Sequence, residues 1–160
     1  MSLVRFLMLL SLVVWIGGII FFAFVVAPTV FKPGILPSHQ LAGNVVNRSL
    51  SLLHAIAIVC GIVFAAMSMI NSSVVNGSAQ PFAFRNVLVY LMIILTLTSM
   101  FGVGAKMQEL RQQMVNIDEV PQDDSRRVEF NRLHLWSTRL EGTVLLLGLA
   151  VVFLTARRIT

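Results

Sequence analysis

A stripe of polar residues enters the last apolar stretch of the chain, and it carries the side chains best suited to chemistry. A helix over residues 133–149 would place four of them on one face, at spacings of three, four and seven: His134, Ser137, Thr138 and Glu141. Imidazole and carboxylate groups can bind cations and carry protons. An ionised glutamate at the centre of a membrane helix costs roughly 2.5–3.5 kcal/mol, so we expect Glu141 to be paired.

Three basic residues are the candidate partners of Glu141. Lys106 is preferred because its long side chain can reach across the membrane boundary, and Arg139 comes second. His134 lies about 10 Å away along the helix axis, so a contact would require a bridging group or water. A structural ion pair that only holds two helices together is the alternative to a functional site.

Two further polar residues lie in other apolar segments. His54 could ligate a metal or haem, relay protons, or form a hydrogen bond between helices. Ser99 belongs to a small polar group in the next apolar segment. The candidate polar cluster therefore comprises His54, Ser99, Lys106, His134, Ser137 and Glu141.

The rest of the sequence argues against most catalytic and metal-binding classes. Cys60 is the only cysteine, so neither an intrachain disulfide nor a thiolate metal cage can form. The eight methionines are scattered, which favours packing over Cu(I) binding. No phosphate-binding loop, dinucleotide-binding glycines, zinc-protease motif or nucleophile elbow occurs, and a helical stripe provides no oxyanion hole. We expect no enzymatic activity and no cofactor, and metal binding stays open.

The composition is that of an integral membrane protein. Hydrophobic residues make up 57% and charged residues 12% of the 160 residues, and the mean hydropathy is +0.86. Lys and Arg number 12 against 7 Asp and Glu. In so apolar a chain, basic residues set the topology and meet anionic headgroups, so we expect no nucleic-acid partner.

Four apolar segments are long enough to span ~30 Å of hydrocarbon. The predicted spans are residues 7–31, 50–70, 87–105 and 135–156, in a single domain of residues 1–160. The first span resembles a signal peptide with a weak cleavage site at residues 25–27, but its apolar region is too long and Pro28 directly follows that site, so we expect an uncleaved helix. The predicted fold class is all-α, an integral membrane four-helix bundle with a polar interfacial loop between helices 3 and 4.

The connections are predicted from turn-forming and polar residues. Residues 32–49 contain helix-breaking Pro and Gly, and their second half is expected to lie along the interface. Residues 71–85 are predicted as a turn-rich loop. Residues 106–132 are expected to form an amphipathic hairpin with a helix N-cap at Asp124 or Ser125. Its apolar side is predicted from Met107, Leu110 and Met114.

Four spans place both termini on one side of the membrane. His54, Ser99, Lys106, His134 and Glu141 then share one leaflet, and the opposite end carries Tyr90, Ser68 and little else. Basic residues are more frequent on the side of the first and third loops, which favours these loops in the cytoplasm. In a bacterium the expected location is the inner membrane. Gly17, Gly18 and Pro28 are the expected helix-packing residues.

A set of short motifs extends over nearly the whole chain: Trp15-Ile16-Gly17-Gly18, Phe21-Phe22, Val26-Ala27-Pro28, Ala42-Gly43, Phe130-Asn131-Arg132-Leu133-His134, Ser137 and Leu147-Gly148. Together they resemble the transmembrane protein 205-like family, also catalogued as domain of unknown function 4149. The resemblance implies a four-helix membrane domain in which Trp15, Gly18, Pro28, His134 and Ser137 match the pattern residues. It implies no reaction. The helix count and histidine placement give a more distant likeness to the copper-resistance membrane domain, which the scattered methionines weaken.

Three functions are compatible with these residues. The first is binding or translocation of a small polar or cationic species in the leaflet that holds His54, His134 and Glu141. The second is a structural or assembly module without transport activity, in which the same residues only lock the helices. The third is a haem- or copper-binding membrane protein that uses His54 and His134. The bilayer is the expected partner, with a second copy or another membrane protein as further candidates and the small ligand unidentified.

Overall fold

The computed structural model describes residues 2–114 and 117–157, and all regular elements within these ranges are helical. The helices are α1 (Ser2–Phe21), η1 (Phe22–Val26), α2 (Ala27–Val30), α3 (His39–Asn76), α4 (Phe84–Leu97), η2 (Thr98–Gly104), α5 (Ala105–Met114) and α6 (Ser125–Ala156). Four continuous segments are long and apolar enough to cross a membrane: Ser2–Val30, His39–Asn76, Phe84–Met114 and Ser125–Ala156. The predicted all-α fold with four membrane helices is confirmed, and the chain is a multi-pass membrane protein.

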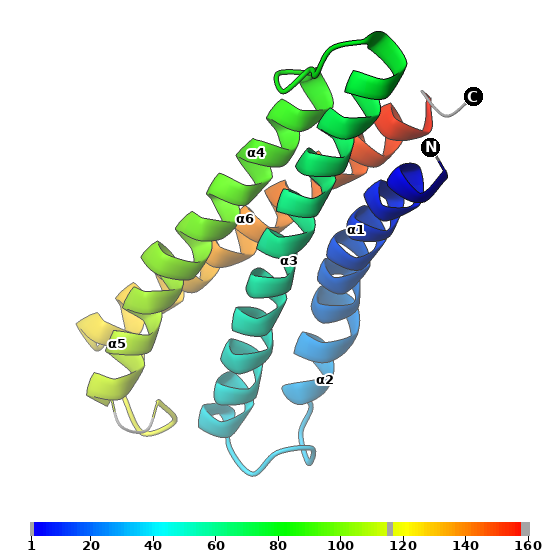
Figure 1. Cartoon of the computed structure of the whole chain (residues 1–160). Coiled ribbons are helices and arrows are strands. Elements are labelled where there is room, and N and C mark those ends of the chain that lie inside the picture. Colours follow the sequence, from blue (N-terminus) through cyan, green and yellow to red (C-terminus); the bar gives the residue numbers. More distant parts are fainter. Residues whose placement is uncertain (1, 115–116, 158–160) are drawn as a thin grey trace.

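The four long helices form an up-down-up-down bundle. α1 packs against α3 and α6, and α4 packs against the same two helices, so all four surround one interior. Figure 1 shows both termini and the α3–α4 connection at one end of the bundle, here named the terminal end. The segments that follow α2 and precede α6 lie at the other end, here named the loop end.

Large apolar side chains fill the interior between the two ends. Seven of them are at most 1% exposed: Leu12, Trp15, Phe64, Val89, Met92, Val144 and Val151. Since lipid tails are as apolar as these side chains, close packing rather than exclusion of water holds them together. The outer surface is apolar as well. On α6, for example, the exposed series runs from Leu135 to Phe153 and faces the lipid.

α3 extends beyond both ends of the predicted second span. Its N-terminus is capped by Ser38, whose hydroxyl accepts a hydrogen bond from the backbone N–H of Leu41. It passes the expected end near residue 70, and in this added stretch Ser72 and Ser73 donate their hydroxyls to the carbonyl of Met69. Gly77, at a φ of 74°, then ends it. The predicted loop over residues 71–85 is therefore only the short segment between Asn76 and Phe84.

The predicted amphipathic hairpin is built from α5 and the first half of α6. Leu110 and Met114 pack against Phe130, with Met107 at the edge of the same cluster. The apolar side thus meets the partner helix rather than the bilayer surface. The N-cap prediction at Asp124 is confirmed, since its carboxylate accepts from the backbone N–H of Arg126.

The packing predictions differ in outcome from residue to residue. Gly18 faces α3, and a Cβ there would lie 2.6 Å from Cδ1 of Leu53. Gly17 is exposed, with no neighbouring atom within 4 Å of such a Cβ, because it points away from α3. Pro28 is also exposed. It has no N–H to continue the α-helical ladder, and just before it η1 widens so that Ala27 N–H donates to the carbonyl of Phe22. Within the bundle, Gly18 is therefore at a helix contact, whereas Gly17 and Pro28 are exposed.

Candidate functional site

Three polar side chains meet inside the bundle. Nε2 of His54 lies 2.5 Å from Oε1 of Glu141, and Oγ of Ser99 donates to the same oxygen over 3.3 Å. The His54 side chain is 5% exposed and that of Glu141 is 17% exposed. These residues come from α3, η2 and α6, so one carboxylate oxygen links three of the four long helices.

The local helix geometry explains how these side chains converge. Ser99 lies in η2, whose wider turn shifts the side chains that follow it around the helix axis relative to a regular α-helix. Glu141 lies six residues beyond Leu135, where the lipid-facing series of α6 begins, which is about 9 Å along the axis. The site therefore lies within the bundle, toward its loop end.

Glu141 takes neither of the partners that the sequence favoured. Lys106 is two turns beyond Ser99, at the polar surface, where its ammonium lies 2.9 Å from Oε2 of Glu109. The guanidinium of Arg139 lies over the ring of Trp136, 5.8 Å from its centroid. Side-chain reach favoured Lys106 and Arg139 as partners of Glu141. The rotation of α3 about its axis instead places His54 directly against Glu141.

The remaining predicted residues lie apart from the pair. His134 is exposed, and its backbone carbonyl accepts from the hydroxyl of Thr138. Ser137 is buried one turn before Glu141. Of the six residues in the candidate cluster, the structure joins His54, Ser99 and Glu141 by hydrogen bonds.

The geometry also bears on metal and haem ligation. Nε2 of His54 faces Glu141, and His134 is two turns earlier on α6, about 10 Å along the axis, so the two imidazoles do not face one site. In the ranges 2–114 and 117–157, no group of three or more His, Cys, Asp or Glu side chains could hold a metal ion. The chemistry that this arrangement supports directly is proton binding.

The pair can hold a proton in two ways. An imidazolium beside a carboxylate and a neutral imidazole beside a carboxylic acid are both electrically neutral overall. Removal of one proton leaves a net negative charge between the packed helices, where unpaired charge is costly. Ser99 offsets part of this charge because its hydroxyl donates to the same oxygen.

A second polar region lies at the terminal end, where the sequence predicted little beyond Tyr90 and Ser68. Arg85 is 7% exposed and its Nε donates to the hydroxyl of Ser68 over 2.9 Å. Asn86 is fully buried, and its amide donates to the carbonyl of Gln80. The sequence prediction missed this region because it began the third span at residue 87, which left Arg85 as a flanking charge. The signal was present: Arg85 and Asn86 directly precede an apolar run without an intervening break.

Comparison with known protein families gives a match. Residues 10–116 match the model of a family described as "Domain of unknown function (DUF4149)". No curated protein and no solved structure matches significantly. The matched range contains His54 and Ser99 and ends before Glu141. Since it covers about two thirds of the sequence, the chain belongs to the DUF4149 family.

Proposed function

We propose that this chain is a membrane protein that binds a small cation, in the simplest case a proton, at the pair of His54 and Glu141. The observation that carries the proposal is the 2.5 Å separation of Nε2 and Oε1 inside the bundle. Two titratable side chains are seldom placed together in a membrane without a role, because their isolation from water is costly. No enzymatic step is part of the proposal.

The short separation favours a proton over larger cations. Atoms 2.5 Å apart leave no room for a metal ion or an organic cation between them. Lys106, at the surface, and His134, exposed on the same helix as Glu141, would lie outside the binding site in this proposal.

The packing favours binding over an open channel. Beyond the pair, toward the terminal end, the interior is occupied by the apolar core around Trp15, Phe64 and Met92. A proton that reaches the pair from the loop end therefore meets a dry barrier. Translocation across the whole membrane would require the bundle to rearrange, and η2 is the element whose irregular backbone bonds make it a candidate hinge.

We also propose the narrower assignment to the transmembrane protein 205-like group. The motifs that suggest it continue beyond the matched range, through Phe130 to His134, Ser137 and Gly148 on α6. This assignment supplies no reaction, so the proposed proton site rests on the geometry alone.

Infrared difference spectroscopy tests the proposal. We expect acid-minus-neutral spectra of the purified protein in lipid nanodiscs to contain a carboxyl band that Glu141→Gln removes. Glu109→Gln is the matched control, because Glu109 is an acid of the same protein that pairs with Lys106 at the surface. Its spectrum should keep the Glu141 band.

Histidine NMR provides the second arm of the test. The nitrogen signals of His54, assigned with a His54→Gln variant, should titrate together with the carboxyl band and shift in Glu141→Gln. If wild type and Glu141→Gln give the same protonation spectra while both stay folded, the pair is not a proton site. A purely structural role, the main alternative, would then account for it.

A further inference from the structure

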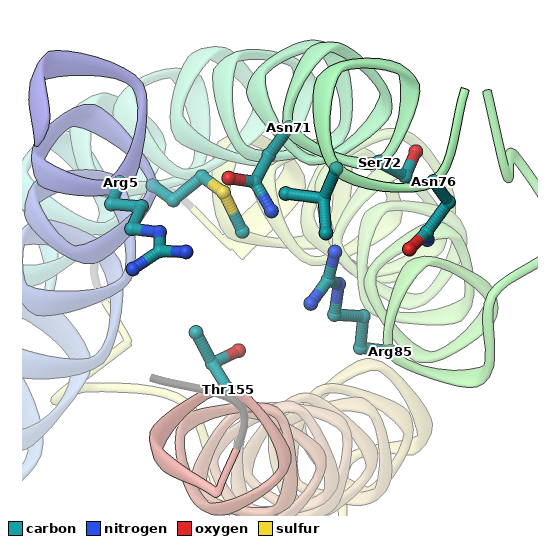
Figure 2. A pocket seen from close by; sticks show the side chains of 8 residues that line it. Arg5, Asn71, Ser72, Asn76, Arg85 and Thr155 are labelled. Carbon is teal, nitrogen blue, oxygen red and sulfur yellow. The ribbon is translucent and has the colours of Figure 1, made fainter. Parts of the chain in front are cut away.

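A cavity of about 240 Å³ opens inside the terminal end of the bundle. All four long helices contribute to its wall: Arg5 comes from α1, Asn71 and Asn76 from α3, Arg85 from α4, and Thr155 from α6. Figure 2 shows the guanidinium groups of Arg5 and Arg85 extending into the space between the helices from opposite sides. The cavity is separated from the His54–Glu141 pair by the apolar core, so the two polar sites are distinct.

Among the described lining residues of the cavity, the charged side chains are both arginines. Two guanidinium groups line it, and its described lining residues include no Asp or Glu. Arg85 is held in place by its Nε hydrogen bond to Ser68, which orients the planar group. Two guanidinium groups that line one cavity can both bind an oxyanion placed between them.

Two polar atoms in the wall lack a partner among the described residues. One is the hydroxyl oxygen of Thr155, a residue that is 3% exposed, and the other is Oδ1 of Asn71. A buried hydroxyl without a hydrogen bond is unfavourable, and such groups in a native protein call for an explanation. An oxyanion in the cavity would accept a hydrogen bond from the hydroxyl of Thr155. A hydroxyl or ammonium group attached to the oxyanion would donate to Oδ1 of Asn71.

We propose that this cavity binds a phosphate ester, with Arg5 and Arg85 as the charged ligands and Thr155 as a neutral donor. A guanidinium group can donate two parallel hydrogen bonds to phosphate oxygens, so arginines on opposite walls can hold one phosphate from both sides. The cavity is smaller than the ~300–1,000 Å³ of sites for drug-sized ligands, so it fits a headgroup or a free anion.

The position of the cavity favours a phospholipid headgroup as the source. Arg5 is in the first turn of α1 and Thr155 in the last turn of α6, at the depth where headgroups lie. Val75 lines the cavity and is itself 53% exposed, so the polar interior adjoins an apolar outer surface that acyl chains can cover. A soluble phosphate would use the same arginines, and the experiment below separates the two sources.

Thermal unfolding of the purified protein tests the site. Wild type is compared in nanodiscs of phosphatidylcholine alone and of phosphatidylcholine mixed with phosphatidylglycerol, and separately in detergent with and without inorganic phosphate. We expect the anionic lipid to raise the melting temperature of wild type and of Arg157→Gln, a control that removes one charge from the same end without altering the cavity lining. The affinity for the lipid, measured by titration, should fall about ten-fold or more in Arg5→Gln.

A second variant keeps the test valid if loss of an arginine disturbs folding. Thr155→Val is nearly isosteric and removes the unpartnered hydroxyl, so it should melt no lower than wild type without ligand and respond less to the lipid. An arginine-dependent response to free phosphate alone would assign the site to a soluble phosphate ester. No response to either ligand, or an equal response in wild type and Arg5→Gln, overturns the proposal. Glu141→Gln should respond like wild type, because its site is separate.

Discussion

Side chains from two other helices contact the carboxyl group of Glu141, and substitutions can separate the effect of its charge from the effect of its shape. His54 and Ser99 both bond Oε1, so the carboxyl group is a structural acceptor as well as the proposed proton carrier. A glutamine keeps the acceptor oxygen and cannot carry the charge. An alanine removes both, and it leaves the imidazole of His54, which is buried, without its partner.

The first prediction separates these two roles. Glu141→Gln should keep the fold, with a melting temperature close to that of wild type. Glu141→Ala should lower the free energy of unfolding by about 1–3 kcal/mol, the cost of an unsatisfied buried polar group. Thermal melts in one detergent measure both. Glu109→Ala is the control, because exposed ion pairs contribute only about 0–1 kcal/mol. Equal melting temperatures for the Gln and Ala variants would show that His54 does not depend on Glu141.

At the scale of elements, glycines allow the helices to approach where their faces meet. A Cβ at Gly61 would lie 2.8 Å from the rings and methyl groups of Trp15 and Ile93, so α1 and α4 both pack closely on α3 there. Gly148 on α6 faces Ile16, and a Cβ there would overlap its side chain and lie 3.2 Å from Cε of Met92. Such small residues are the usual means of close packing in membranes.

The second prediction uses two glycines of one helix. Gly148→Leu should destabilise the bundle by about 1–3 kcal/mol or more, since the added side chain has to displace Ile16 and Met92. Gly142→Leu should be tolerated, because nothing lies within 4 Å of a Cβ at that position. Both variants replace Gly with Leu in α6, so the change in helix propensity is the same and cancels when their melting temperatures in detergent are compared. Similar destabilisation by both changes would contradict the α1–α6 packing.

The start of α6 gives a third prediction, on pH. The side chain and backbone N–H of Arg126 hydrogen-bond the carboxylate of Asp124 and lower its pKa from an ordinary 3.8 to about 2. A carboxyl whose pKa is lower in the folded state stabilises it at pH values above its ordinary pKa, and this contribution disappears as the pH falls through about 2.

Wild type should therefore melt higher than Asp124→Ala at neutral pH, and the difference should narrow as the pH falls below about 4. Asp124→Asn keeps a capping acceptor without the charge, so its melting temperature relative to Asp124→Ala should not change over that range. A wild-type advantage that stays constant down to pH 2 would mean that the charge of Asp124 contributes nothing.

At the scale of the molecule, hydropathy predicts the number of spans and their order, because a membrane requires about twenty apolar residues for each crossing. It does not determine how each helix is rotated about its axis. The contact of His54 with Glu141, which are 87 residues apart in the sequence, depends on the rotations of α3 and α6 together. The sequence therefore predicted that His54, Ser99 and Glu141 lie toward the same end of the bundle, where the structure joins them, but it favoured the wrong partner for Glu141.

The terminal end was missed for a different reason. A charge next to a predicted span looks like a topology signal, and Arg85 was counted as one. Its burial follows from α4 starting at Phe84 and from the serine at position 68, one helix away, that accepts its Nε hydrogen bond. A membrane span predicted from hydropathy alone ends at the first polar residues. It therefore leaves out polar side chains that are buried at the ends of the bundle.

The topology of the whole molecule yields the last prediction. Cys60 is buried, so the wild-type chain should react poorly with a membrane-impermeant maleimide and serve as the background. Single cysteines are then placed at three exposed positions: Ser78→Cys between α3 and α4, Lys32→Cys after α2, and Gln122→Cys before α6. In intact cells, Ser78→Cys should be labelled at once, because the positive-inside rule favours the loop end in the cytoplasm. Lys32→Cys and Gln122→Cys should be labelled only after permeabilisation. The reverse labelling pattern would mean that the orientation is the opposite one, with the four spans unchanged. Four crossings require Lys32 and Gln122 to share a side. Labelling of Lys32→Cys and Gln122→Cys from opposite sides would therefore contradict the four-helix bundle.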